Sequence, residues 1–141
     1  MAEATFYQLA ETLSEEGRQL QAICRVIQKV YQVTGGAGVL CTSAEAARTL
    51  DDLLWTFNQG SFIPHGLAPS DEPVCLATEV QTLPPRRVLV LTVPTLPDDL
   101  AGFERVVDFI LPDPEAVKAA RRRYRALASR GYSLTLHPLP A

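Results

Sequence analysis

The chain lacks any long hydrophobic run: no apolar stretch in its 141 residues approaches the ~18–20 residues that cross a bilayer. It also lacks a basic amino-terminal segment, because Glu3 stands where a secretory signal would carry lysine or arginine. Cysteine is scarce, and Cys24, Cys41 and Cys75 lie too far apart for the C-x-x-C spacing of metal ligands. We therefore predict a cytoplasmic protein with no membrane partner, no metal site and three reduced thiols packed in its core.

The motifs of nucleotide binding and catalysis are missing as well. The G-x-x-G at residues 35–38 precedes a predicted strand, whereas a dinucleotide-binding loop follows a strand and opens a helix. There is no G-x-x-x-x-G-K-[ST] phosphate loop and no G-x-S-x-G nucleophile elbow. His65 and His137 are predicted in separate loops without an obvious partner acid. These absences predict a protein with no cofactor and no active site of its own.

Basic charge is confined to one segment near the end of the chain. The formal net charge is −3, from 13 basic and 16 acidic side chains. Residues 114–130 hold six of the basic side chains and one acid, a local charge of +5, so the remainder holds seven and fifteen, a charge of −8. A duplex-DNA binder usually shows a broad basic footprint. This distribution favours a compact acidic ligand and argues against strong direct DNA binding.

Hydrophobic periodicity predicts strands that alternate with helices. Predicted helices cover residues 20–31, a segment opened by a Thr42-x-x-Glu45 capping box, and 114–130; a long loop covers 58–73. The predicted strands are residues 5–9, 38–41, 74–79, 87–93, 106–111 and 132–137. The pattern predicts one α/β domain over residues 1–141, a layered sandwich of mainly parallel sheet with helices on both faces, Rossmann-like but without its nucleotide motif. Because no helix separates 74–79 from 87–93, part of the sheet is open to an antiparallel arrangement.

The last predicted helix carries a stripe of like charge. At 100° per residue, one sector about 100° wide holds four basic side chains, and Tyr124 lies on its flank. The four are Lys118, Arg121, Arg122 and Arg125. A solvated cationic face is one interpretation, but like charges three and four residues apart repel. The aromatic ring beside them suits a peptide that ends in an apolar side chain and a free carboxylate.

A second candidate surface follows the preceding helix. Trp55 stands near its end, and Phe57, Phe62 and Ile63 follow within eight residues. Tryptophan is enriched at the energetic centres of protein interfaces. Core packing is the alternative fate for at least one of these rings.

Five groups of residues, spread in order over residues 4–132, resemble the chi subunits of bacterial DNA polymerase III holoenzyme, accessory proteins of the clamp-loader complex. They are Ala4-Thr5-Phe6-Tyr7; Leu50-Asp51 with Leu54-Trp55; Ser61-Phe62-Ile63-Pro64-His65; Val106-Val107-Asp108-Phe109; and Arg121-Arg122-Arg123-Tyr124-Arg125 with Gly131-Tyr132. The resemblance implies a non-enzymatic bridge with a Rossmann-like fold. It would bind the acidic, Phe-terminated tail of single-stranded-DNA-binding protein and, separately, the psi subunit.

The resemblance also implies which residues make each contact. The tail site is carried over to Ile110, Lys118, Arg121, Tyr124 and Arg125, and the psi-binding surface to Trp55 and Phe62. Tyr124 and Ile110 would line a pocket for the last Phe ring, and Arg121 would hold the terminal carboxylate. Arg125 and Lys118 would meet upstream acids, although Lys118 stands one residue after the lysine of relatives, where this chain has Val117. Two charge-assisted contacts and one buried ring predict micromolar affinity, about −8 kcal/mol.

Two hypotheses from other classes stay open on the sequence alone. A small α/β nucleotide-dependent enzyme or regulator fits the predicted fold, although its phosphate loop is missing. Direct single-strand DNA binding through the basic helix is disfavoured because few aromatic side chains accompany the charges for base stacking.

Overall fold

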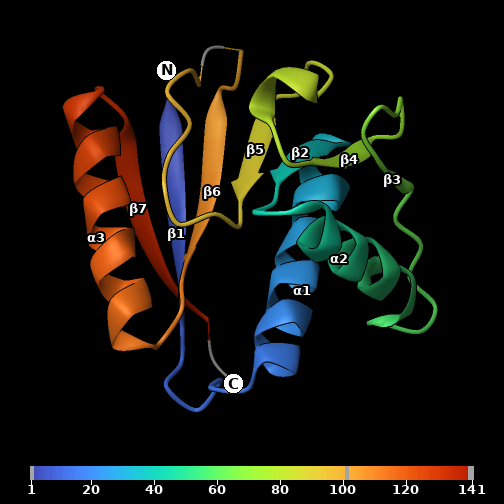
Figure 1. The fold of residues 1–141 in the computed structure, drawn as a ribbon, viewed down its shortest axis with the longest axis horizontal. Helices are drawn as coiled ribbons and strands as arrows, with labels where there is room; N and C mark the ends of the chain where they lie inside the picture. Colours follow the sequence, from blue (N-terminus) through green and yellow to red (C-terminus); the bar gives the residue numbers. More distant parts are fainter. Residues whose placement is uncertain (1, 101, 140–141) are drawn as a thin grey trace.

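The computed structural model describes residues 2–100 and 102–139, which form one seven-stranded sheet with helices against it (Figure 1). The strands are β1 (Glu3–Leu9), β2 (Ala37–Leu40), β3 (His65–Leu67), β4 (Val74–Ala77), β5 (Val88–Leu91), β6 (Arg105–Ile110) and β7 (Ser133–Leu139). The helices are α1 (Glu16–Thr34), α2 (Ala44–Thr56) and α3 (Pro114–Ser129), with a short 3-10 helix, η1 (Val80–Thr82). The strand order is β3-β4-β2-β5-β6-β1-β7.

Two hydrophobic clusters, one on each face of the sheet, form the core. Side chains of α1 and α2, such as Ile27 and Leu54, pack with Val39 and Val90 on one face. On the other face Leu127 of α3 packs in a cluster with side chains of β1, β2, β5 and β6. Figure 1 shows α3 beside β7, and α1 and α2 beside the other half of the sheet. The predicted α/β sandwich with helices on both faces is confirmed. The three cysteines are buried and unpaired, as predicted.

The expectation that part of the sheet could be antiparallel is wrong, because all the strand pairs are parallel. β4 and β5 do not pair with each other; they lie on either side of β2. Residues 78–87 make the parallel crossover with η1 in place of a long helix. A Cβ on Gly38 of β2 would lie 3.0 Å from Cδ1 of Leu83, so the glycine allows this compact crossover to pass close to the sheet.

Two local predictions are also corrected. The amino-terminal cap of α2 is Ser43, whose Oγ accepts a hydrogen bond of 3.1 Å from the N–H of Ala46, so the Thr42-x-x-Glu45 capping box does not form. The predicted loop at 58–73 contains the short strand β3, which pairs parallel to β4. Three residues flanked by Pro64 and containing Gly66 give too short a hydrophobic pattern to indicate a strand.

The ends of α3 follow the sequence closely. The carboxylate of Asp113 accepts a hydrogen bond of 3.0 Å from the N–H of Ala116, and Pro114 occupies the first turn. Gly131, with φ of 86°, follows the end of the helix, a backbone conformation that favours glycine. The chain then enters β7, which lies at the edge of the sheet as predicted. α3 therefore connects β6 to β7, two strands that lie with β1 at one edge of the sheet.

Candidate protein-binding surfaces

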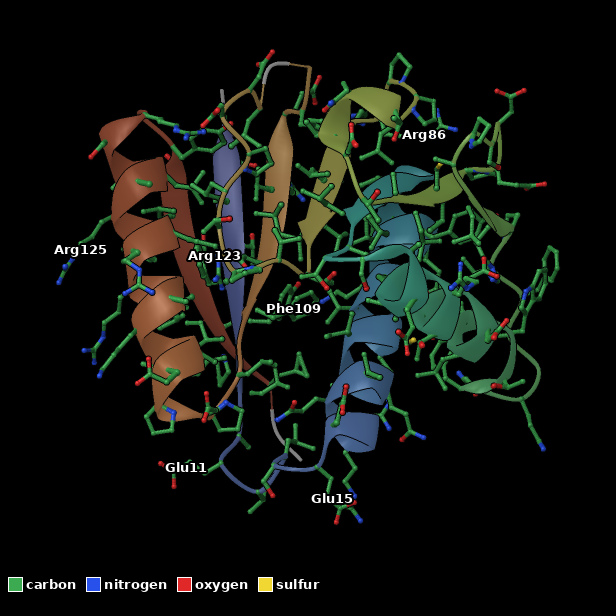
Figure 2. All side chains as sticks on the ribbon, viewed as in Figure 1. Glu11, Glu15, Arg86, Phe109, Arg123 and Arg125 are labelled. Atoms are coloured by element: carbon green, nitrogen blue, oxygen red, sulfur yellow. The ribbon has the colours of Figure 1, made fainter. Side chains whose placement is uncertain are left out.

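A buried ion pair fixes the rotation of α3 on the sheet. Nε of Arg123 lies 2.7 Å from Oδ2 of Asp108 on β6, and both side chains are almost fully buried. The other guanidinium nitrogens donate to the carbonyl oxygens of Pro94, at 3.0 Å, and Phe109, at 3.1 Å. Figure 2 shows Arg123 directed from α3 toward β6, while Arg125 points away from the protein.

The Asp108 carboxyl is almost fully buried and is held by two hydrogen-bond donors. Its Oδ1 accepts a hydrogen bond of 2.7 Å from the N–H of Phe109, and Arg123 binds its other oxygen. Burial raises the pKa of Asp108, and the contacts with Arg123 and with the Phe109 amide oppose that rise. The sequence reasoning missed this pair. The available signal was one aspartate inside an apolar strand and one arginine close to the core side of the helical projection.

With Arg123 inside, the remaining basic residues of α3 face solvent. The side chains in question are Lys118, Arg121, Arg122 and Arg125, all exposed. Lys118 makes an exposed ion pair of 3.5 Å with Glu115, one turn earlier. Over residues 2–100 and 102–139, no ion pair joins Arg121, Arg122 or Arg125 to an acid. The sequence therefore located the cationic surface correctly, and its guanidinium groups are available to a ligand.

Three residues in register on neighbouring strands form a row across the face of the sheet that α3 covers. Strand register aligns Asp108 of β6, Phe6 of β1 and Leu136 of β7, so their side chains point to the same face. The ring of Tyr124 lies 5.3 Å from that of Phe6, which is fully buried. Tyr124 remains 39% exposed, and Leu136, next in the row, is 51% exposed. Two half-exposed apolar groups thus lie on the face of the sheet that α3 covers: Tyr124 on the helix itself and Leu136 on the edge strand.

Ile110 lies on the same face of the sheet, one row further along. It is half-buried at the end of β6 and is in register with Gln8 of β1. α3 runs antiparallel to the strands it connects, so Arg121, one turn before Tyr124, lies toward this row. Leu136 was missed by the sequence reasoning. The alternation of Leu134 and Leu136 in the last predicted strand was the signal that could have found it.

The second candidate surface is an exposed aromatic pair. Trp55, near the end of α2, is 51% exposed and Phe62 is 69% exposed, and their ring centroids lie 5.8 Å apart. Phe57 packs against the core, and Ile63 is buried within it. Core packing is therefore the fate of Phe57 and Ile63, whereas Trp55 and Phe62 stay exposed and their use as an interface stays a prediction. Within the described ranges, Trp55 and Phe62 are the only aromatic side chains apart from Tyr124 that are large, apolar and exposed.

The expectation that His65 sits in a loop without a partner acid is wrong. It is buried on β3, with Nε2 2.8 Å from the carbonyl oxygen and 3.5 Å from Oδ1 of Asp51 on α2. Burial raises the pKa of Asp51; His65 lowers it and Asp52 raises it further. The unexpected strand β3 carries His65 against α2, which explains the contact. His137 is also on a strand, exposed on β7, with its ring 5.8 Å from that of Tyr7.

The described residues also bear on three other kinds of site: a metal site, a membrane-spanning helix and a ligand cavity. Among the described residues no three His, Cys, Asp or Glu side chains are grouped to hold a metal ion. The helices of the described chain include none that is both long and apolar enough to cross a membrane. A cavity of about 240 Å³ lies between α1, α3 and the ends of β5 and β6, with apolar walls apart from Thr92, Asp108 and Arg123. The charges in its wall already bind each other.

Comparisons with known proteins point to one family over nearly the whole chain. The family described as DNA polymerase III chi subunit, HolC, matches residues 1–135. DNA polymerase III subunit chi of Pseudomonas aeruginosa is 29% identical, over 99% of each chain. The subunit of the same name from Escherichia coli is 29% identical, over 95% of this chain and 96% of its own.

Solved structures of low sequence identity share the fold. The C-terminal domain of the DEAD-box protein Dbp5 superposes with a TM-score of 0.59 at 14% identity, over 97% of this chain and 91% of that one. T4 UvsW has a TM-score of 0.61 at 7% identity, over 99% of this chain and 41% of its own. At these identities the likeness concerns the α/β fold alone.

Proposed function

Since this chain belongs to the DNA polymerase III chi subunit family, we propose that it links two proteins within the replication machinery. In this proposal α3 binds the acidic carboxyl-terminal tail of single-stranded-DNA-binding protein. The aromatic pair Trp55 and Phe62 binds a psi-like subunit of the clamp-loader complex. The role is that of a replication accessory subunit, and the proposal assigns it no chemical step.

The observation that carries the tail-binding proposal is the set of free guanidinium groups beside Tyr124 and Leu136. Arginine binds a carboxylate through two parallel hydrogen bonds, and Arg121 is exposed and free for that geometry. The half-exposed Tyr124 and Leu136 provide apolar surface for the last side chain of the tail. Ile110 extends this surface, and Arg125 and Lys118 meet acids further upstream. The rest of the molecule is acidic and repels the tail, which favours binding at α3.

The size of the Arg121 contribution follows from the type of contact. A hydrogen bond to a charged group is worth about 1.5–3 kcal/mol. Replacing Arg121 by alanine should therefore weaken tail binding by roughly 10- to 150-fold. Because the contacts are exposed to solvent, the affinity should also fall as ionic strength rises.

Titration of a fluorescently labelled tail peptide, followed by anisotropy, tests this proposal. Wild type is compared with Arg121→Ala and with Arg25→Ala, a matched removal of one exposed arginine from α1 on the other face of the sheet. The proposal requires loss of affinity in the Arg121 variant only. Equal binding by all three proteins would refute the assignment of the site to α3.

The psi-binding proposal rests on the exposure of Trp55 and Phe62. Aromatic side chains carry a large share of the binding energy at protein interfaces, and both of these residues are more than half exposed. Trp55→Ala should abolish co-purification with a psi-like partner and leave tail binding unchanged. Retention of the partner would count against this surface. Loss of both interactions would indicate a folding defect, which far-UV circular dichroism would reveal.

A further inference from the structure

The proposed psi-binding surface has a buried histidine beneath it. The side chain of His65 is 0% exposed, and its ring centroid lies 4.2 Å from that of the half-exposed Trp55. Trp55 in turn lies against Phe62. His65 therefore lies on the inner side of the aromatic pair, where its own contacts determine how the tryptophan is supported.

Both ring nitrogens of His65 face oxygen atoms that only accept hydrogen bonds. Nδ1 is 2.6 Å from the carbonyl oxygen of Ile63, and Nε2 is 2.8 Å from that of Asp51. A neutral imidazole has one N–H and one nitrogen lone pair, so in that state one of these contacts would join two acceptors. Only the imidazolium form donates both hydrogen bonds.

The surroundings of the ring are compatible with a positive charge. From α2, Asp51 places Oδ1 at 3.5 Å from Nε2, while Asp52 acts on the pKa of Asp51. The segment 58–64 contributes no ionisable side chain, and on β4 the residue in register with His65 is Val74. A cation within ~6 Å of an indole ring is attracted to its face, which adds a contact to Trp55.

We propose that His65 is a positioning residue for the Trp55–Phe62 surface, and that protonation of its ring controls how Trp55 is held. As the imidazolium, His65 joins the carbonyl of Ile63 to that of Asp51 and supports the indole from below. Loss of one proton breaks one of these two links and weakens the support that His65 gives to the indole. The use of the surface rests on the proposed function, but the coupling of His65 to Trp55 does not.

Tryptophan fluorescence measures this coupling directly, because Trp55 is the only tryptophan in the chain. We expect the emission of wild type to show a step as the pH is raised, and His65→Gln to abolish it. His137→Gln, a matched change at the exposed histidine, should keep the step. No step in wild type, or a step that His65→Gln leaves intact, would overturn the proposal.

A measurement on the wild-type protein covers the case in which His65→Gln fails to fold. Nitrogen-15 shifts of the His65 ring should show two protonated nitrogens on the acidic side of the fluorescence step. Both signals should then change at the same pH. A single protonated nitrogen throughout, or transitions at different pH values, would overturn the proposal. Neither measurement contains a partner protein, so failure of the psi-binding proposal would leave these results unchanged.

Discussion

Removal of the Arg123 guanidinium should be among the most damaging single changes in this protein. Arg123→Met keeps an unbranched side chain of similar length in the space between α3 and β6. It leaves the Asp108 carboxyl buried, with the Phe109 amide as its remaining hydrogen-bond donor. The carbonyl oxygen of Phe109, also bound to Arg123, loses that donor too. The substitution therefore tests whether the ion pair holds α3 on the sheet.

The size of the expected loss in stability follows from the burial of both Arg123 and Asp108. Breaking a buried pair by removing one member typically costs 3–5 kcal/mol, because an uncompensated charge or an unpaired carboxyl remains inside. For a chain of this length each kcal/mol corresponds to roughly 3 °C, so the melting temperature should fall by about 10–15 °C. Replacing both partners by apolar residues is often close to neutral. The double variant Arg123→Met with Asp108→Leu should therefore recover most of the lost stability.

The assay is urea unfolding of Arg123→Met, Asp108→Leu, the double variant and wild type. Arg122→Met serves as the matched control, since it removes an exposed arginine from the neighbouring position and should change the free energy of unfolding by less than about 0.5 kcal/mol. The reasoning is refuted if Arg123→Met behaves like Arg122→Met. It is also refuted if the double variant loses as much as the two single changes added together.

Two further predictions concern the core and the cap of α2. Burial raises the pKa of Cys24 from 9.0 to about 12, so its thiolate fraction near pH 8 is about a thousandfold lower than that of an ordinary cysteine. Alkylation of native Cys24, read by mass spectrometry, should be at least that much slower than in urea, and comparable rates would contradict the burial. Ser43→Ala should lower the free energy of unfolding by about 1 kcal/mol, while Thr42→Ala should have little effect. A larger loss of stability in Thr42→Ala than in Ser43→Ala would instead support a capping box at Thr42.

The sequence predicted the layers of this fold because they depend on local patterns. Alternating hydrophobic runs and helical periodicity located β1, α1, β2, α2, β4, β5, β6, α3 and β7 in order, and Pro114 and Gly131 marked the region of α3. The parallel pairing of β4 and β5 with β2 was not predicted. It depends on a crossover that passes close to the sheet because Gly38 has no Cβ. The close approach is between Gly38 and Leu83, which are distant in sequence.

The candidate sites were predictable to the same extent. The basic stripe and the place of Tyr124 beside it followed from helical geometry, whereas Trp55 was singled out by the enrichment of tryptophan at interfaces and by the resemblance to chi subunits. The burial of Arg123 was missed, although the helical projection places it nearer the core side than the other arginines, because its partner Asp108 lies fifteen residues earlier on another element. His65 was misassigned for a similar reason. Its partner Asp51 belongs to another element, and only the pairing of β3 with β4 brings the two together.

The central claim is that the face formed by α3 and β7 binds the acidic tail, and mapping the peptide on the protein by NMR tests it most directly. Addition of tail peptide should shift the amide signals of Arg121, Tyr124, Arg125 and Leu136 and leave that of Trp55 in place. The same peptide with an amidated carboxyl terminus should produce much smaller shifts, since it lacks the carboxylate proposed to bind Arg121. Shifts centred on α2, or equal shifts with both peptides, would contradict the account.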